Sequence, residues 1–275
     1  MKSWRRSLLY VVIGYLGFVL MLVFLENKLL YHPTNGVGGN WVAPPANSGI
    51  EDVDLTSSDG TRIHAWYCPH PTSDEALLYC HGNAGNISWR GNSVVKLRDL
   101  VGVSVLIFDY PGYGKSDGSP SEQGCYDAAE AGYVWLTETK KFAPKKTLIY
   151  GGSLGGGIAV DLASRKEHRG LVLVKTFTSA PDAACSIYWW LPVPIRSLMT
   201  NQFDNVSKID KCHRPVFVAH GAADEIIPHA LGERLFAAAH EPKEFMSIPG
   251  NSHNDPMPTE FFTKVRAFFQ ANPVD

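Results

Sequence analysis

The sequence lacks any strong excess of charge. Its 275 residues include 25 lysines and arginines against 27 aspartates and glutamates, a formal net charge of −2. The basic residues are scattered, whereas nucleic-acid-binding domains concentrate lysine and arginine in one patch. Internal repeats and low-complexity tracts are also missing from the sequence. We therefore exclude nucleic acid as a partner and expect one ordinary globular core.

Nothing in the sequence indicates a metal or a cofactor. The cysteines are few, odd in number and never spaced as Cys-x-x-Cys: Cys68, Cys80, Cys125, Cys185 and Cys212. This pattern fits neither a zinc site nor a dense disulfide framework. Buried thiols are expected, and a Cys185–Cys212 bridge stays open. Residues 112–116 imitate the end of a P-loop, but Asp109 stands where that motif needs its first glycine.

Charge is absent from one long stretch near the N-terminus, residues 8–25. As a helix this stretch would be about 27 Å long, close to the hydrocarbon thickness of a bilayer. A cleaved signal peptide usually has a shorter apolar core that ends in a small-x-small site, and Phe24-Leu25-Glu26 offers none. We predict a membrane anchor over residues 1–27, with residues 8–25 in contact with lipid.

The charges that flank this stretch predict its orientation. Lys2, Arg5 and Arg6 precede it, whereas Glu26 and Lys28 follow it. Positive charge favours the cytoplasmic side of a membrane. The N-terminus is therefore expected in the cytoplasm and the remainder of the chain on the opposite side of the membrane.

The chain after the anchor divides into a connector, residues 28–50, and a domain, residues 51–275. Residues 33–45 are rich in glycine, proline and asparagine, which is typical of a connector. Two strands around the Ser58-Asp59-Gly60 turn predict an antiparallel hairpin. From Glu75 onward apolar strands alternate with helical stretches, which predicts crossovers and a mainly parallel sheet.

A candidate nucleophile follows the apolar run at residues 147–150. The sequence there is Gly-Gly-Ser-Leu-Gly, with Ser153 at its centre. Glycines on both sides permit a very tight turn from strand to helix, which would expose the serine oxygen. A serine hydroxyl attacks carbonyl groups at neutral pH only when a base takes its proton. A glycine-rich turn that merely contains a serine is the alternative.

The required partners follow in the order acid, then histidine. Asp224 comes just after an apolar strand at residues 214–219, and His253 comes after a strand at residues 244–249. The ends of parallel strands share one edge of a sheet. Ser153, Asp224 and His253 are therefore predicted to meet there as a catalytic triad.

Chemistry assigns the roles within this triad. An imidazole, with its ordinary pKa near 6.5, can take the proton of Ser153 and return it to the leaving group. The carboxylate of Asp224 would fix the tautomer of His253. Other residues compete for these roles, namely Glu225 and Asp182 for the acid and His220, His229 and His240 for the base.

An oxyanion hole is predicted from a second small-residue loop. A short apolar strand at residues 76–80 precedes His-Gly-Asn-Ala-Gly-Asn at residues 81–86. We assign the two donors to the backbone N–H groups of Leu154 and Asn83, with Ala84 as the alternative second donor.

Several motifs together resemble the Bem46-like branch of the α/β-hydrolases, which includes the mammalian α/β-hydrolase domain-containing types 13 and 17. The matching segments are HGNAGN (81–86), DYPGYGKSDGSPSE (109–122), GGSLG (151–155), FTS (177–179), HGAADEIIP (220–228) and SHND (252–255). The likeness extends from about residue 27 to the end of the chain. Lys175-Thr176 departs from it, because Glu-Ser is more usual there.

The resemblance implies the α/β-hydrolase fold, with a mostly parallel eight-stranded sheet, helices on both faces and a small cap insertion. It further implies a serine hydrolase that cleaves esters or thioesters without a cofactor. Family members are often tethered to membranes, and one type is associated with the removal of acyl groups from cysteines.

The cap insertion is placed at residues 176–213. It contains a run of aromatic and aliphatic residues, from which Tyr188, Trp189 and Leu191 are candidates for substrate binding. These residues would form an apolar surface that accepts an acyl chain. Alternatively, they pack the cap onto the core or rest on a bilayer.

Two further functional classes stay open beside an esterase or thioesterase. One is a peptidase or amidase of the prolyl-oligopeptidase type, although the chain offers no propeller domain. The other is a catalytically silent hydrolase fold that serves as an interaction module, which would be expected to lack a triad member. The natural acyl chain and the oligomeric state are not predicted.

Overall fold

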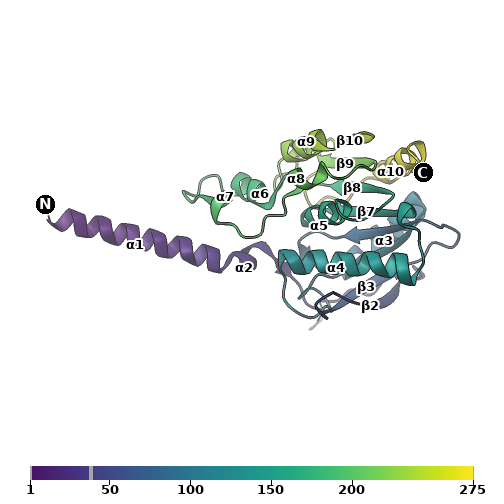
Figure 1. The fold of residues 1–275 in the computed structure, drawn as a ribbon, viewed down its shortest axis with the longest axis horizontal. Helices are drawn as coiled ribbons and strands as arrows, with labels where there is room; N and C mark the ends of the chain where they lie inside the picture. Colours follow the sequence, from purple (N-terminus) through teal and green to yellow (C-terminus); the bar gives the residue numbers. More distant parts are fainter. Residues whose placement is uncertain (1, 37–39, 275) are drawn as a thin grey trace.

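One sheet of eight strands forms the centre of the molecule (Figure 1). In spatial order its strands are β10 (Lys243–Ile248), β9 (Val216–Gly221), β8 (Gly170–Val174), β7 (Thr147–Gly152), β4 (Ala76–Cys80), β6 (Ser104–Phe108), β3 (Arg62–Cys68) and β2 (Glu51–Thr56). Neighbours from β10 to β6 pair in parallel, and the hairpin β2–β3 adds two antiparallel pairings at one side. The structure is a computed structural model that describes residues 2–36 and 40–274. The predicted parallel sheet and its hairpin are confirmed.

Helices cover both faces of this sheet. On one face lie α4 (Glu122–Val134), α5 (Leu154–Ala163) and α9 (His229–Ala238), and on the other lie α3 (Gly91–Lys96) and α10 (Thr259–Ala271). The segment after the loop at residues 81–86 folds as a 3₁₀ turn (Ile87–Arg90), α3 and a π-helical turn (Leu97–Val101) in succession.

The strands divide their side chains between these two layers. In β4, Leu78 and Cys80 belong to the apolar cluster under α4 and α5, whereas Leu77 and Tyr79 belong to the cluster under α10. Successive strand residues point to opposite faces. Because both faces are covered, the parallel strands are continuously apolar and every residue of β4 is buried.

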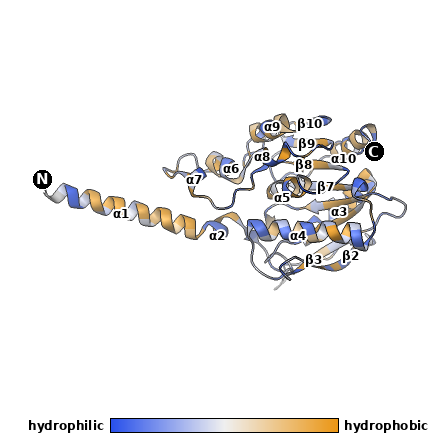
Figure 2. Cartoon of the chain, in the orientation of Figure 1, coloured by the Kyte–Doolittle hydropathy of each residue, from blue (hydrophilic) through white to orange (hydrophobic). Residues whose placement is uncertain are grey.

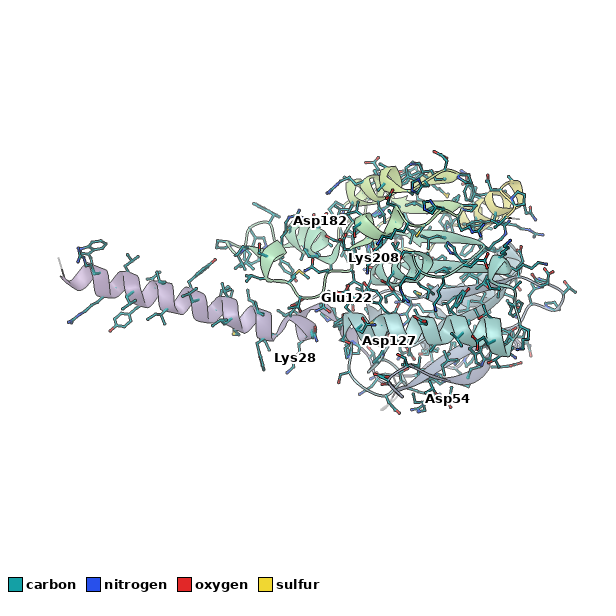
Figure 3. All side chains as sticks on the ribbon, viewed as in Figure 1. Lys28, Asp54, Glu122, Asp127, Asp182 and Lys208 are labelled. Carbon is teal, nitrogen blue, oxygen red and sulfur yellow. The ribbon has the colours of Figure 1, made fainter. Side chains whose placement is uncertain are left out.

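A single long helix, α1 (Lys2–Phe24), projects from the globular body (Figure 1). Most of its length is hydrophobic (Figure 2), and many of its large apolar side chains are exposed, including Leu8, Tyr10 and Leu20. The short α2 (Glu26–Leu30) continues it, and the charged Lys28 lies where this unit meets the body (Figure 3).

The segment predicted as a connector, residues 28–50, contains regular secondary structure. It includes the end of α2 and a two-residue strand, β1 (His32–Pro33), which pairs in parallel with β5 (Ala84–Gly85). Residues 37–39 lie outside the described residues. The division of the chain at residues 28 and 51 stays a prediction.

The predicted cap lies between β8 and β9. It contains α6 (Ala180–Ile187), α7 (Ile195–Leu198) and α8 (Asn205–Ile209). All five cysteines fall within the described part of the chain and all are free thiols, so the Cys185–Cys212 bridge does not form in the structure. Cys212 is buried against Val160 of α5, whereas Cys185 is half-buried on α6.

Candidate active site

Ser153 occupies the turn between β7 and α5, as the glycine pattern predicts. Its backbone has φ +52°, a conformation that residues with side chains rarely adopt. A bond from its N–H to Val174 O, 2.9 Å long, ties the turn to β8. Gly155 is required two residues later, because a Cβ there would lie 2.1 Å from Cys80 O. The neighbouring backbone therefore holds Ser153 in a strained turn.

Three predicted residues lie in one hydrogen-bonded chain. His253 Nε2 is 3.1 Å from Ser153 Oγ, and His253 Nδ1 is 2.8 Å from Asp224 Oδ2. The residues follow β7, β9 and β10, whose C-terminal ends lie at one edge of the sheet. When Nδ1–H donates to the carboxylate, Nε2 can accept the proton of the serine hydroxyl.

The side chain of Asp224 is buried, and both of its oxygens have hydrogen-bond partners. Its Oδ1 accepts the N–H groups of Ile226 and Ile227, at 3.0 and 2.8 Å. Its Oδ2 also lies 3.3 Å from His220 Nε2. Burial alone would raise the pKa of Asp224, but the hydrogen bonds from His220 and His253 outweigh it and hold this pKa well below its usual range. The carboxylate is therefore ionised at neutral pH.

The competing candidates lie elsewhere or make other contacts. Glu225 accepts the backbone N–H of His253 at 3.2 Å, whereas the ring nitrogens of this histidine bond Asp224 and Ser153. Asp182 bonds Thr178 and Arg196 in the cap, where Figure 3 labels it. Among the histidines, His220 shares Asp224 with His253, His229 contacts Ser247, and His240 contacts Asp210.

The loop after β4 lies against the nucleophile. A Cβ built on Gly82 would be 3.4 Å from Ser153 Cβ. The Asn83 side chain accepts from His32 N–H and Tyr113 OH, at 3.2 and 2.8 Å, and donates to Leu30 O. This side chain secures the loop, which leaves the main-chain N–H as the group that Asn83 can offer to a substrate. Ala84, the alternative donor, pairs with His32 between β1 and β5.

Comparisons with known proteins agree with this architecture. A family model described as the alpha/beta hydrolase fold matches residues 75–192. The chain is 39% identical over 245 residues to the uncharacterized Mycobacterium tuberculosis protein Rv2307c, a match that covers 87% of this chain and 84% of the relative. It is 32% identical to the human alpha/beta hydrolase domain-containing protein 17B, with 75% and 70% covered. The chain belongs to the α/β-hydrolase family. A Pyrococcus furiosus esterase, Pf2001, has the same fold, with a TM-score of 0.71 at 19% identity, and the match covers 88% of this chain and all of that one.

Lys175 was not identified from the sequence as a functional candidate, although Lys175 departs from the residue that related α/β-hydrolases usually have at this position. Lys175 is buried at the end of β8, and its ammonium donates to the carbonyls of Ser252, His253 and Asp255, at 2.6, 3.1 and 2.8 Å. Burial lowers the pKa of Lys175, and the carboxylate of Asp224 opposes this shift. The lysine thus fixes the loop that carries His253.

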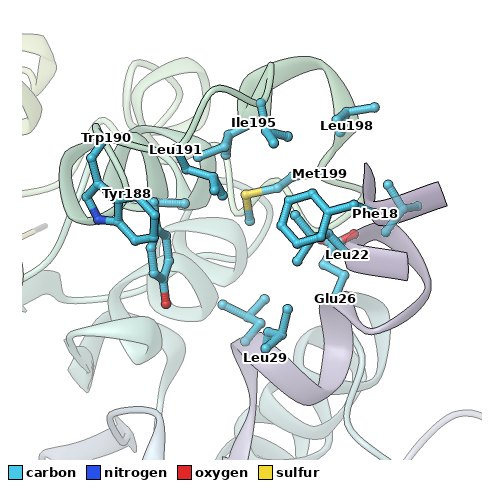
Figure 4. A pocket seen from close by; sticks show the side chains of 14 residues that line it. Phe18, Leu22, Glu26, Leu29, Tyr188, Trp190, Leu191, Ile195, Leu198 and Met199 are labelled. Atoms are coloured by element: carbon cyan, nitrogen blue, oxygen red, sulfur yellow. The ribbon is translucent and has the colours of Figure 1, made fainter. Parts of the chain in front are cut away.

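The aromatic residues of the cap have different surroundings. Tyr188 and Leu191 line an apolar pocket of about 330 Å³ between the cap and α1 (Figure 4). Trp189 is 81% exposed and does not line it. Ser153 and its two partners are not among the residues that line this pocket.

Proposed function

We propose that this α/β-hydrolase is a membrane-anchored serine hydrolase that cleaves carboxylic esters or thioesters through an acyl-Ser153 intermediate. The observation that carries the proposal is the continuous hydrogen-bonded chain Asp224–His253–Ser153 at three strand ends. The family membership and the esterase of like fold support a hydrolase.

The first half-reaction forms the acyl-enzyme. Ser153 Oγ attacks the substrate carbonyl carbon while His253 Nε2 takes the hydroxyl proton. Asp224 stabilises the imidazolium that forms. The negative oxygen of the tetrahedral intermediate would be held by the N–H groups of Leu154 and Asn83. The N–H of Leu154 suits this role, because it lies in the first turn of α5, where N–H groups have no intrahelical acceptor.

The second half-reaction regenerates the serine. The intermediate collapses, its carbon–oxygen or carbon–sulfur bond breaks, and the imidazolium gives its proton to the departing alcohol or thiol. A water molecule then attacks the acyl-serine while His253 takes its proton. The second tetrahedral intermediate releases the carboxylic acid and restores the Ser153 hydroxyl.

The N-terminal helix supports the membrane part of the proposal. The stretch Trp4–Phe24 is long and apolar enough to cross a bilayer. Arg5 and Arg6 at its start favour a cytoplasmic N-terminus, with the globular domain on the opposite side. Retention of the chain in membranes after alkaline carbonate washing tests the anchor, and protease added to that side tests the orientation.

Substitution of Ser153 tests the chemistry. We expect Ser153→Ala to reduce hydrolysis of p-nitrophenyl butyrate by at least about 10⁴-fold and to abolish labelling by a fluorophosphonate. Ser164→Ala, at the end of α5, is the matched control and should keep both. Labelling that persists in Ser153→Ala would place the nucleophile elsewhere, and faster turnover of alanine amides than of esters would favour a peptidase.

A further inference from the structure

The pocket between α1 and the cap has no role in the reaction described so far. We propose that it holds one acyl chain of a bilayer lipid, which enters sideways from the leaflet next to the globular domain. The inference rests on the proposed function, because it takes α1 as a membrane span and the bound chain as substrate.

The lining of the pocket fits hydrocarbon and little else. One wall comes from α1 and α2 and the other from the cap (Figure 4). Apolar side chains dominate both walls, among them Phe18, Leu22, Leu29, Leu191, Leu198 and Met199. Such a surface gives a polar ligand no partners, whereas each buried methylene of an aliphatic chain is stabilising.

The one charged residue among the described lining residues, Glu26, is already satisfied. Its carboxylate accepts from the N–H and hydroxyl of Thr200, at 2.9 and 2.7 Å, and from the N–H and side-chain amide of Asn201, at 2.8 and 2.9 Å. These bonds join the anchor to the cap. They fix the two walls relative to each other and leave the carboxylate no need of a polar ligand.

The outer part of the pocket lies at hydrocarbon depth. Tyr15 OH donates to Pro192 O at 2.6 Å, which places the cap beside the middle of α1. Tyr15 is ten residues before Leu25, about 15 Å along the helix. The cap also lies beside α1 in Figure 1. A bilayer crossed by α1 would therefore also receive the tip of the cap.

The tip of the cap is suited to that environment. Residues 187–195 contain no charge, and Trp189 and Trp190 are 81% and 62% exposed. The N–H groups of Leu191, Val193 and Ile195 donate to carbonyls within the tip, and the two intervening residues are prolines, which have no N–H. Hydrocarbon tolerates backbone only when its polar groups are paired internally, as these three N–H groups are.

The end of the pocket nearest the globular domain is linked to the loop beside Ser153. The half-buried Leu30 lines it there, and its carbonyl accepts the side-chain amide of Asn83. Asn83 belongs to the loop that lies against Ser153. A chain seated in the pocket thus contacts the segment that secures the proposed oxyanion loop, and the substrate class is a long-chain lipid ester of the bilayer.

Photolabelling of the full chain tests the pocket. The Ser153→Ala protein would be placed in nanodiscs that contain a phosphatidylcholine with a diazirine on one acyl chain. We expect label on Leu22 and Met199. Filling the pocket with Ala184→Trp, or independently with Leu22→Trp, should lower labelling of Met199 at least about fivefold, since each excluded methylene weakens binding several-fold. Leu20→Trp, on an exposed face of α1, is the matched control and should leave it unchanged.

The outcomes separate this inference from the proposed function. Circular dichroism would establish that the variants are folded. Equal labelling of Met199 in the filled and control variants would then overturn the proposal that the pocket binds a lipid acyl chain. Labelling that occurs only when an acylated peptide replaces the lipid would also overturn it. If Ser153 of the wild-type chain failed to react with a fluorophosphonate, the proposed serine-hydrolase function would be overturned, whereas the evidence for lipid binding in the pocket would be unaffected. In the active chain, filling the pocket should lower the palmitate-to-butyrate rate ratio of p-nitrophenyl esters about tenfold.

Discussion

The candidate active site and the interface between α1–α2 and the cap are stabilised by different kinds of contact. The site consists of polar side chains at the ends of β7, β9 and β10, within one hydrogen-bonded chain. The interface is mainly apolar, and one buried carboxylate, that of Glu26, accepts hydrogen bonds from the cap across it. The sheet therefore fixes the chemistry, whereas contacts between elements outside the sheet fix the surface that would receive a substrate chain.

Disruption of the triad should have the largest effect. Asp224→Asn presents an amide to His253 Nδ1, which favours the tautomer that cannot take the serine proton. We expect ester hydrolysis to fall about 10⁴-fold while the fold survives. Steady-state kinetics with p-nitrophenyl butyrate measures this. Glu225→Gln, the adjacent carboxylate, should keep nearly full activity, and an equal loss there would assign the acid to Glu225.

Removal of the lysine under the histidine loop should have an intermediate effect. Lys175→Met leaves three carbonyls without their donor, so the imidazole is less well placed. We expect kcat to fall about 10- to 100-fold with KM little changed and with an altered pH profile. Lys175→Arg should restore part of the rate. Lys264→Met removes an ammonium that pairs with Glu260 on α10 and should change nothing. A purely structural role would lower stability and leave the pH profile unchanged.

A substitution at the interface between α1–α2 and the cap should lower the stability of the protein more than its rate of ester hydrolysis. Glu26→Gln removes the charge that accepts from Thr200 and Asn201, and we expect the free energy of unfolding to fall by about 1.5–3 kcal/mol. Tryptic cleavage after Arg196 in the cap should become faster in detergent-solubilised protein. Lys28→Gln, two residues away and exposed, is the control. Unchanged cleavage would mean that the contacts of Glu26 do not hold the cap.

Acid should produce the smallest of these changes. The folded state lowers the pKa of Asp224, so the unfolded chain takes up the proton first. The resulting stabilisation is present above the ordinary carboxyl pKa of about 4 and is lost as the pH falls through the folded pKa. Denaturant unfolding between about pH 6 and pH 3 should show a steeper loss for the wild type than for Asp224→Asn. Equal slopes would contradict this assignment.

The sequence predicted the parts of the fold and site that depend on local pattern. Glycines around Ser153 predicted the turn, and apolar runs before Asp224 and His253 predicted the strand ends. The parallel order then brought them to one edge. The contacts of Lys175 with the loop that carries His253 were not predicted, because its partners lie 77–80 residues away in a loop with no periodic signal.

The sequence by itself determined the sheet, the candidate triad residues and the apolar helix, because these follow from short-range periodicity, strand order and the length of an uncharged run. Only the tertiary structure decided that Glu26 bonds residues 174 and 175 positions away, that Tyr15 reaches Pro192, and that α1, α2 and the cap line one pocket. Such contacts depend on how irregular segments pack once the sheet has formed, and no local pattern encodes that packing.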